Sequence, residues 1–194
     1  MDHPDRLPGL SPEAMSPEAR KLLNVTVERT ASTEAGGGGP PRRKPLHILT
    51  VMAHHPTLLG PFIEWATALA LYGELPKRAQ EILALRAAVR CRSEFEWGHH
   101  VVYGRAAGLS DNEIARVAAG DRDGWDTHEA VLIDAADELI SGFDLSDATW
   151  SALRAHYSDA QLAEIPFVVG QYTMLSMFAN GLGVALEPGY EPLP

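Results

Sequence analysis

The sequence predicts an all-α protein built around one helical domain. Apolar residues recur at helical spacing after residue 45, helix-capping patterns separate the successive segments, and the sustained alternation that marks strands is absent. With 194 residues, 45% of them hydrophobic, the chain has the length of one domain and enough apolar side chains for a core. We expect a bundle of about seven to nine helices of ordinary length.

A glycine- and proline-rich segment divides the chain into an N-terminal extension, residues 1–45, and a main domain, residues 46–194. Residues 36–41 read GGGGPP, a run that the interior of a helix or a strand does not tolerate. The extension should contain one helix, with Ser16 as its N-cap and Pro17 at its first position.

The first half of the main domain reads as successive helices separated by proline or glycine. A short helix is expected from Leu46 to Ala53 and a longer one from Pro56 to about Leu71. Pro76 should open the next helix, and Gly108 should end the helix after that.

Capping residues mark the start of each of the four remaining helices. In three of them a Glu or Gln follows three positions later, as in a capping box. The capping residues are Ser110 with Glu113, Asp126 with Glu129, Ser146, and Ser158 with Gln161. The helix that follows Ser158 is the longest, and Pro166 should bend or restart it.

The stretch Ile165–Leu186 contains no charged residue and is nominally long enough to cross a bilayer. It also contains a proline, three glycines and Asn180, and no Lys or Arg anchors either end. We therefore interpret it as a buried core helix. The N-terminal residues form no apolar leader, so we expect a cytoplasmic protein without a membrane partner.

The charge balance limits the partners. Sixteen Lys and Arg against 26 Asp and Glu give a net charge of −10, which should repel nucleic-acid phosphates. The uncharged last helix has apolar residues on more than one face, so we expect it to have partners on more than one side. This pattern predicts a homo-oligomer.

Residues 81–100, EILALRAAVRCRSEFEWGHH, carry most of the candidate catalytic side chains. Glu96 and His100 are four apart and share one face of a helix, and a bend between the two helices would bring Glu81 to His100. Two carboxylates and an imidazole beside an apolar wall form a site for proton transfer. His99 lies about a quarter-turn away and should face elsewhere.

Each of these residues also has a structural interpretation. Glu96 and His100 can form a solvated surface pair, Trp97 can pack in the core or an interface, and Cys91 can be an inert buried thiol. A metal held by Glu96 and His100 is a further alternative, but adjacent helical histidines cannot both face one ion. We expect neither a metal nor a cofactor.

The same residues resemble the carboxymuconolactone decarboxylase family. Glu81 is followed after twelve positions by Ser93, then by EWGHH at 96–100 and AAGLS at 106–110. VGQY at 169–172 and NGLGV at 180–184 are similar to the last helix of longer members. The resemblance covers roughly residues 45–188 and implies the helical fold of alkyl hydroperoxidase D.

The family has a peroxidase branch in which a CxxCxxxH motif supplies two redox thiols. On that pattern the two cysteine positions fall on Ser93 and Glu96, whereas the histidine and the upstream glutamate match His100 and Glu81. Cys91 is the single cysteine and lies two positions out of register. Because serine cannot form a disulfide, the resemblance favours the branch without the CxxC motif.

The resemblance to the decarboxylase branch implies proton transfer and decarboxylation on a small carboxylated lactone, or a related intermediate of aromatic catabolism. His100 would protonate carbon while Glu81 or Glu96 tunes its imidazole. The candidate substrate-binding residues are Arg92, which would hold the substrate carboxylate, Ser93, Trp97 and Tyr172.

The resemblance also implies a homo-oligomer, with trimers and hexamers familiar in the family. Two alternatives remain. One is a peroxidase or antioxidant protein of the alkyl hydroperoxidase D type, which the missing CxxC motif disfavours. The other is a non-catalytic oligomer that binds a small ligand. An enzyme requires Glu81, Glu96 and His100 to converge on one cavity, whereas a binding or structural protein does not.

Overall fold

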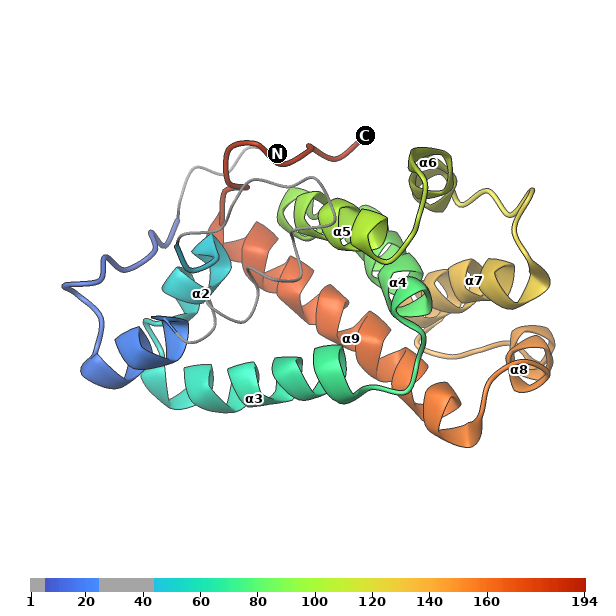
Figure 1. Ribbon diagram of the computed structural model, residues 1–194, viewed down its shortest axis with the longest axis horizontal. Helices are drawn as coiled ribbons and strands as arrows, with labels where there is room; N and C mark the ends of the chain where they lie inside the picture. Colours follow the sequence, from blue (N-terminus) through green and yellow to red (C-terminus); the bar gives the residue numbers. More distant parts are fainter. Residues whose placement is uncertain (1–5, 25–43) are drawn as a thin grey trace.

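A computed structural model describes residues 6–24 and 44–194 (Figure 1). These residues form helices and connecting segments with no strand among them, so the all-α class is confirmed. Residues 17–24 are helical, and the Ser16 hydroxyl accepts the N–H of Ala19 at 3.1 Å, as the predicted N-cap requires. The predicted linker at residues 36–41 lies outside the described residues.

Every helix predicted after residue 45 is present. In chain order these are α2 (His47–Met52), α3 (Pro56–Tyr72), α4 (Lys77–Arg90), α5 (Glu94–Ala106), α6 (Asp111–Ala119), α7 (Thr127–Gly142), α8 (Asp147–Arg154) and α9 (Asp159–Leu182).

Three of the four predicted caps are confirmed. The capping hydroxyls belong to Ser110, Ser146 and Ser158, which accept the N–H groups of Glu113, Thr149 and Gln161. Asp126 is the exception, because its side chain forms no capping hydrogen bond among the described residues. Its expected partner Glu129 instead accepts a hydrogen bond from Arg78 at 2.6 Å. Glu129 therefore pairs with Arg78 of a neighbouring helix instead of completing the local capping box.

The long helix α9 is the central helix, and it packs against α4, α5 and α7 (Figure 1). It continues through Pro166, so the predicted restart is wrong. Ile165, Val168 and Val169 are buried on the core and hold the helix together across the proline. Among the described residues, α9 alone is long and apolar enough to cross a membrane, but half of the relevant window is buried inside the molecule. The fold therefore uses it as a core helix.

Two apolar clusters form the core. The first surrounds α4 and includes the fully buried side chains of Ile82, Leu83 and Leu85 with residues of α7 and α9. The second joins α2 and the C-terminal half of α9 to the N-terminal segment, where Met15 and Leu23 are buried. The described part of the N-terminal extension is thus packed onto the main domain.

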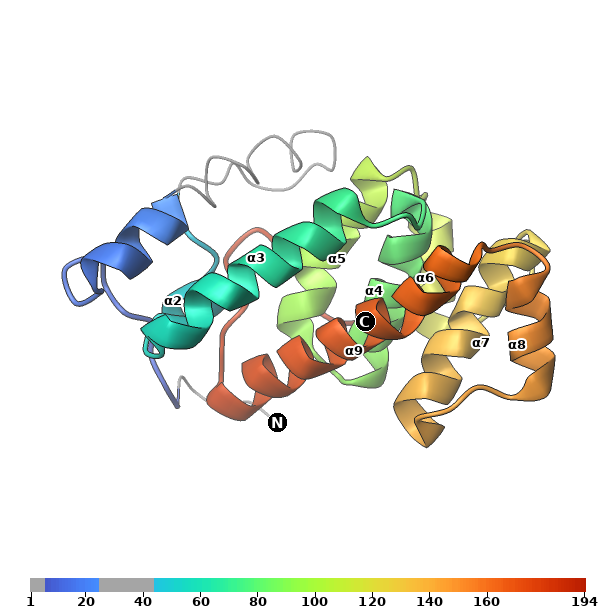
Figure 2. The ribbon, with the colours of Figure 1, turned by 90° about the horizontal axis from the view of Figure 1, so that it is seen from below.

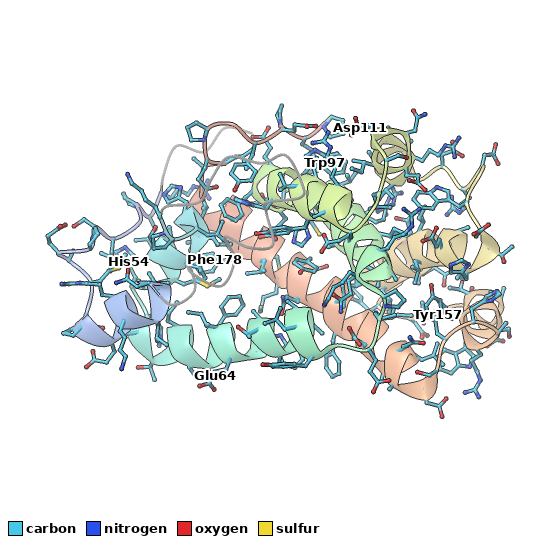
Figure 3. The ribbon with its side chains drawn as sticks, in the orientation of Figure 1. His54, Glu64, Trp97, Asp111, Tyr157 and Phe178 are labelled. Carbon is cyan, nitrogen blue, oxygen red and sulfur yellow. The ribbon has the colours of Figure 1, made fainter. Side chains whose placement is uncertain are left out.

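Helix α3 is the most exposed of the long helices. It lies beside α9 and approaches it where the rings of Trp65 and Phe167 meet at 5.3 Å (Figure 2). Its single charged residue, Glu64, points away from the rest of the molecule (Figure 3). We call the exposed large apolar side chains of these two helices the α3–α9 face; they are Leu58, Trp65, Leu71, Tyr72, Phe167, Met174 and Met177.

Candidate active site

A cavity of about 460 Å³ lies between α2, α3, α4, α5 and α9. Its walls are mostly apolar, with side chains from α2 and α3 facing those of α5 and α9. The polar and ionisable groups that line it are Thr67, Lys77, Gln80, Glu81, Glu96, His99, His100, Tyr103, Gln171 and Tyr172. An apolar cavity with a few convergent polar groups is typical of a small-molecule site.

A tight turn between α4 and α5 brings two of these groups together. Arg92 adopts a left-handed conformation with φ of 53°, and Ser93 then caps α5 by accepting the N–H of Glu96 at 3.4 Å. The predicted bend at this point is present. As a result α5 folds back along α4, and Glu81 faces His100.

Glu81, His100 and Glu96 form a chain of carboxylate, imidazole and carboxylate. His100 Nδ1 lies 2.6 Å from Glu81 Oε2, and His100 Nε2 lies 3.7 Å from Glu96 Oε2. The side chains of His100 and Glu96 are each 5% exposed. We call this set the relay, because each ring nitrogen of His100 faces a carboxylate.

Burial has opposite effects on the pKa values of Glu96 and His100. It raises the pKa of Glu96 to about 7, because desolvation outweighs the charge of His100, and the charge of Glu187 adds to the rise. Burial alone would lower the pKa of His100. The charge and hydrogen bond of Glu81, with the charge of Glu96, outweigh that effect and raise it. Glu96 and His100 therefore titrate as a coupled pair.

One oxygen of the relay is unsatisfied. Glu96 Oε1 is buried and has no hydrogen-bond partner among the described residues. The Tyr172 ring meets the His100 ring edge-on at 4.2 Å. Burial and the nearby carboxylates hold the pKa of Tyr172 well above its usual value, so it remains a phenol that can donate a hydrogen bond.

The model of the carboxymuconolactone decarboxylase family matches residues 56–133, a range that includes the whole relay. Residues 56–133 belong to the carboxymuconolactone decarboxylase family. The family match confirms the resemblance inferred from Glu81, Glu96 and His100. A comparison with curated proteins gives no match.

Solved structures share the fold at low sequence identity. The peroxidase-related protein from Ralstonia eutropha JMP134, described as an alkylhydroperoxidase AhpD core, is 18% identical with a TM-score of 0.79, over 96% of this chain and 94% of that one. A peroxidase-related protein from Silicibacter sp. TM1040 is 16% identical with a TM-score of 0.76, over 98% and 97%. The debrominase Bmp8 is 12% identical with a TM-score of 0.75, over 94% and 92%. These likenesses support the alkyl hydroperoxidase D-like fold.

Three of the four predicted substrate-binding residues do not line the cavity. Trp97, labelled in Figure 3, is buried in the apolar cluster around α4, about a quarter-turn of α5 away from Glu96. Ser93 is fully buried as the N-cap of α5. Arg92 is exposed in the turn. Tyr172 does line the cavity.

The arginines of α4 are likewise bound elsewhere. Arg86 forms a two-pronged ion pair with Asp137 and also donates to the carbonyls of Val117 and Ala118. Among the described residues that line the cavity, Lys77 is the only lysine or arginine, and its ammonium donates to the carbonyl of Ala70 and to Gln80 Oε1.

The expectation that His99 faces away from the site is wrong. His99 lines the same cavity, and its Nε2 lies 2.8 Å from Glu187 Oε2. The rings of Phe95 and Tyr190 flank it, with centroids 4.7 and 4.1 Å away. Glu187 could not be predicted from the sequence, because it lies 88 residues from His99 in a segment without helical periodicity.

Cys91 lies outside the cavity lining, where α4 ends beside α9. Burial raises the pKa of its thiol and outweighs the hydrogen bonds from Thr173 and Ser176. The described residues include no group of three or more His, Cys, Asp or Glu side chains arranged to hold a metal ion. The ionisable side chains that do line the cavity, Glu81, Glu96 and His100 among them, can take part in acid–base chemistry.

Proposed function

We propose that this chain is a general acid–base enzyme that delivers a proton to carbon as it decarboxylates a small carboxylated lactone, or a related intermediate of aromatic catabolism. The observation that carries the proposal is the buried relay Glu81–His100–Glu96 at the wall of a cavity of about 460 Å³. This convergence favours an enzyme over a non-catalytic binding protein.

The proposed step balances without an oxidant or a reductant. The bond between the substrate carboxylate and its β,γ-unsaturated carbon skeleton breaks, and carbon dioxide leaves. The electron pair of that bond passes through the neighbouring double bond onto the ring carbonyl, which holds the charge as a dienolate. A proton from the enzyme then adds to carbon, so one proton enters for each carbon dioxide that leaves.

Glu96 is the proposed donor. Its pKa of about 7 keeps a large fraction protonated at neutral pH, and its Oε1 atom has no partner among the described residues. His100, 3.7 Å away, resupplies the proton, and Glu81 orients the imidazole from its other nitrogen. Lys77 is the proposed partner of the substrate carboxylate.

Carbon dioxide release from a panel of carboxylated lactones tests the proposal. Glu96→Gln should abolish turnover because it removes the proton. Glu81→Gln should cost less, because it still accepts a hydrogen bond from His100 while losing its charge. If lactones are inert but the protein exchanges solvent deuterium into enolisable ketones in a Glu96-dependent way, the decarboxylation is wrong and the proton transfer stands.

We also propose that the chain acts as a homo-oligomer assembled through the α3–α9 face. Helix α3 is apolar almost all round, yet only Leu59 and Leu69 are buried, and a helix of that kind normally packs on more than one side. Light scattering at micromolar concentration should give a mass above that of one chain. Trp65→Glu should lower it, whereas Trp150→Glu, a similarly exposed tryptophan on α8, should not.

A further inference from the structure

A second imidazole–carboxylate pair reaches the cavity from the C-terminal segment, residues 183–194. Glu187 Oε2 lies 2.8 Å from His99 Nε2, and the His99 side chain is 4% exposed. The other oxygen of Glu187 accepts the N–H of His47 at 2.7 Å. His47 is the first residue of α2, whose side chains form part of the cavity wall. One carboxylate thus joins α5, α2 and the C-terminal segment.

The fold makes room for this segment at Gly98. A Cβ atom there would lie 2.7 Å from Leu186 Cδ1 and 3.0 Å from the carbonyl oxygen of Glu191. The Leu186 side chain would have to shift, and the backbone at Glu191 would have to give by a few tenths of an ångström. Gly98 immediately precedes His99, and its missing side chain therefore lets Glu187 reach the adjacent imidazole.

The pair stands next to the proposed proton donor. Glu96 and His99 are three residues apart on α5, so their side chains are neighbours on the helix surface. The anionic charge of Glu187 helps to raise the pKa of Glu96, after burial itself. The pKa of Glu187 is lowered: burial would raise it, but the hydrogen bond and charge of His99 outweigh burial, with a smaller effect from the His47 N–H.

We infer that Glu187 is a positioning residue of the proposed active site: its carboxylate fixes His99 at the cavity wall and adds a negative charge near Glu96. The inference rests on the proposed function, in which protonated Glu96 is the donor. The other ionisable groups near Glu96 are His100 and Tyr103 on α5, Glu81 on α4 and Tyr172 on α9. Glu187 differs from them because it comes from outside the helical bundle.

A carbon-13 NMR titration of the glutamate carboxyl groups in the full chain tests this without a substrate. The Glu96 signal is assigned by its loss in Glu96→Gln. Glu187→Gln keeps an oxygen for the His47 N–H but removes the charge, so the Glu96 midpoint should fall by on the order of half to one pH unit. Glu191→Gln is the matched control, since Glu191 carries its charge on the surface beside Arg105. Its Glu96 midpoint should stay at the wild-type value.

An unchanged Glu96 midpoint in Glu187→Gln overturns the inference, as does an equal shift in Glu191→Gln. Gly98→Ala provides a second route, because it displaces the segment and should lower the same midpoint while the far-ultraviolet circular dichroism stays helical. Once a substrate is known, its rate of turnover should begin to fall at a lower pH in Glu187→Gln than in the wild type. The difference in pH should equal the shift of the Glu96 midpoint in the titration. If no substrate is turned over, the proposed function fails while the titration still decides the role of Glu187.

Discussion

Helix α4 carries two polar networks only one turn apart, and they differ in what faces the carboxylates. Arg78 binds Glu129 at 2.6 Å and also pairs with Glu113. Three residues later, Glu81 meets His100, whose other nitrogen faces Glu96. The first network joins α4 to α6 and α7, and the second lines the cavity.

The two networks give glutamates of opposite character. The hydrogen bond from Arg78 lowers the pKa of Glu113 to about 2 and outweighs its partial burial, so Glu113 is a permanent anion. Burial raises the pKa of Glu96 to about 7 because an imidazole compensates it only partly. A guanidinium fixes structure, whereas an imidazole between two carboxylates leaves a proton to transfer.

The largest expected effects come from removing a member of the relay, and His100 is the member that faces both of its carboxylates. His100→Ala should lower kcat by about 10²–10⁴-fold, the usual size of a general acid–base contribution, with the fold intact. His156→Ala, an exposed histidine on the opposite part of the molecule, is the control and should leave kcat unchanged. Steady-state kinetics alongside circular dichroism measures both. If His100→Ala left kcat unchanged, the relay would have no catalytic role.

The second effect is on stability. The pKa of Glu96 is raised in the folded state, so its contribution is fully favourable below its unfolded pKa and is lost as the pH rises through about 7. Glu96→Gln should therefore stabilise the protein by a few kcal/mol at pH 8, since one pKa unit corresponds to about 1.4 kcal/mol, and by little at pH 4. Urea unfolding at the two pH values measures this. If Glu96→Gln were less stable than the wild type at pH 8, the interactions of the Glu96 carboxylate would outweigh the cost of burying it.

Replacing Glu113 with Gln should change the free energy of unfolding in the opposite direction. The pKa of Glu113 is lowered, so its contribution is present above its unfolded pKa and is lost as the pH falls towards about 2. Glu113→Gln should cost roughly 1 kcal/mol at pH 7, where it weakens the pair with Arg78 and the capping box of α6. Turnover should be unaffected. Chemical unfolding at pH 7 and pH 3 checks the sign, and a loss that grows at pH 3 would contradict it.

The last substitution, at Cys91, should have almost no effect. Cys91→Ser should change neither stability by more than about 0.5 kcal/mol nor turnover, because the thiol lies outside the cavity and burial keeps it protonated. The wild-type protein should also show no thiol-dependent reduction of alkyl hydroperoxides, since Ser93 and Glu96 occupy the two cysteine positions of the peroxidase motif. Peroxide turnover abolished by Cys91→Ser would refute both statements.

The sequence by itself determined the parts of this protein that depend on local interactions. Helical periodicity, prolines and capping serines predicted each helix, because these signals act within a few residues. Glu96 and His100 could be paired from their spacing on one helix. Glu81 could be added because a single tight turn, at Arg92 and Ser93, had to bring α4 back against α5.

Only the tertiary structure decided which residues share the cavity with that relay. Trp97 and Arg92 have suitable side chains, but the packing of α5 on α4 turns Trp97 into the core and the left-handed turn exposes Arg92. His99 and Glu187 meet across 88 residues, because Gly98 admits the C-terminal segment. The pKa of Glu96 depends on the same packing, since burial and the charges around a carboxyl group are set by elements far apart in sequence.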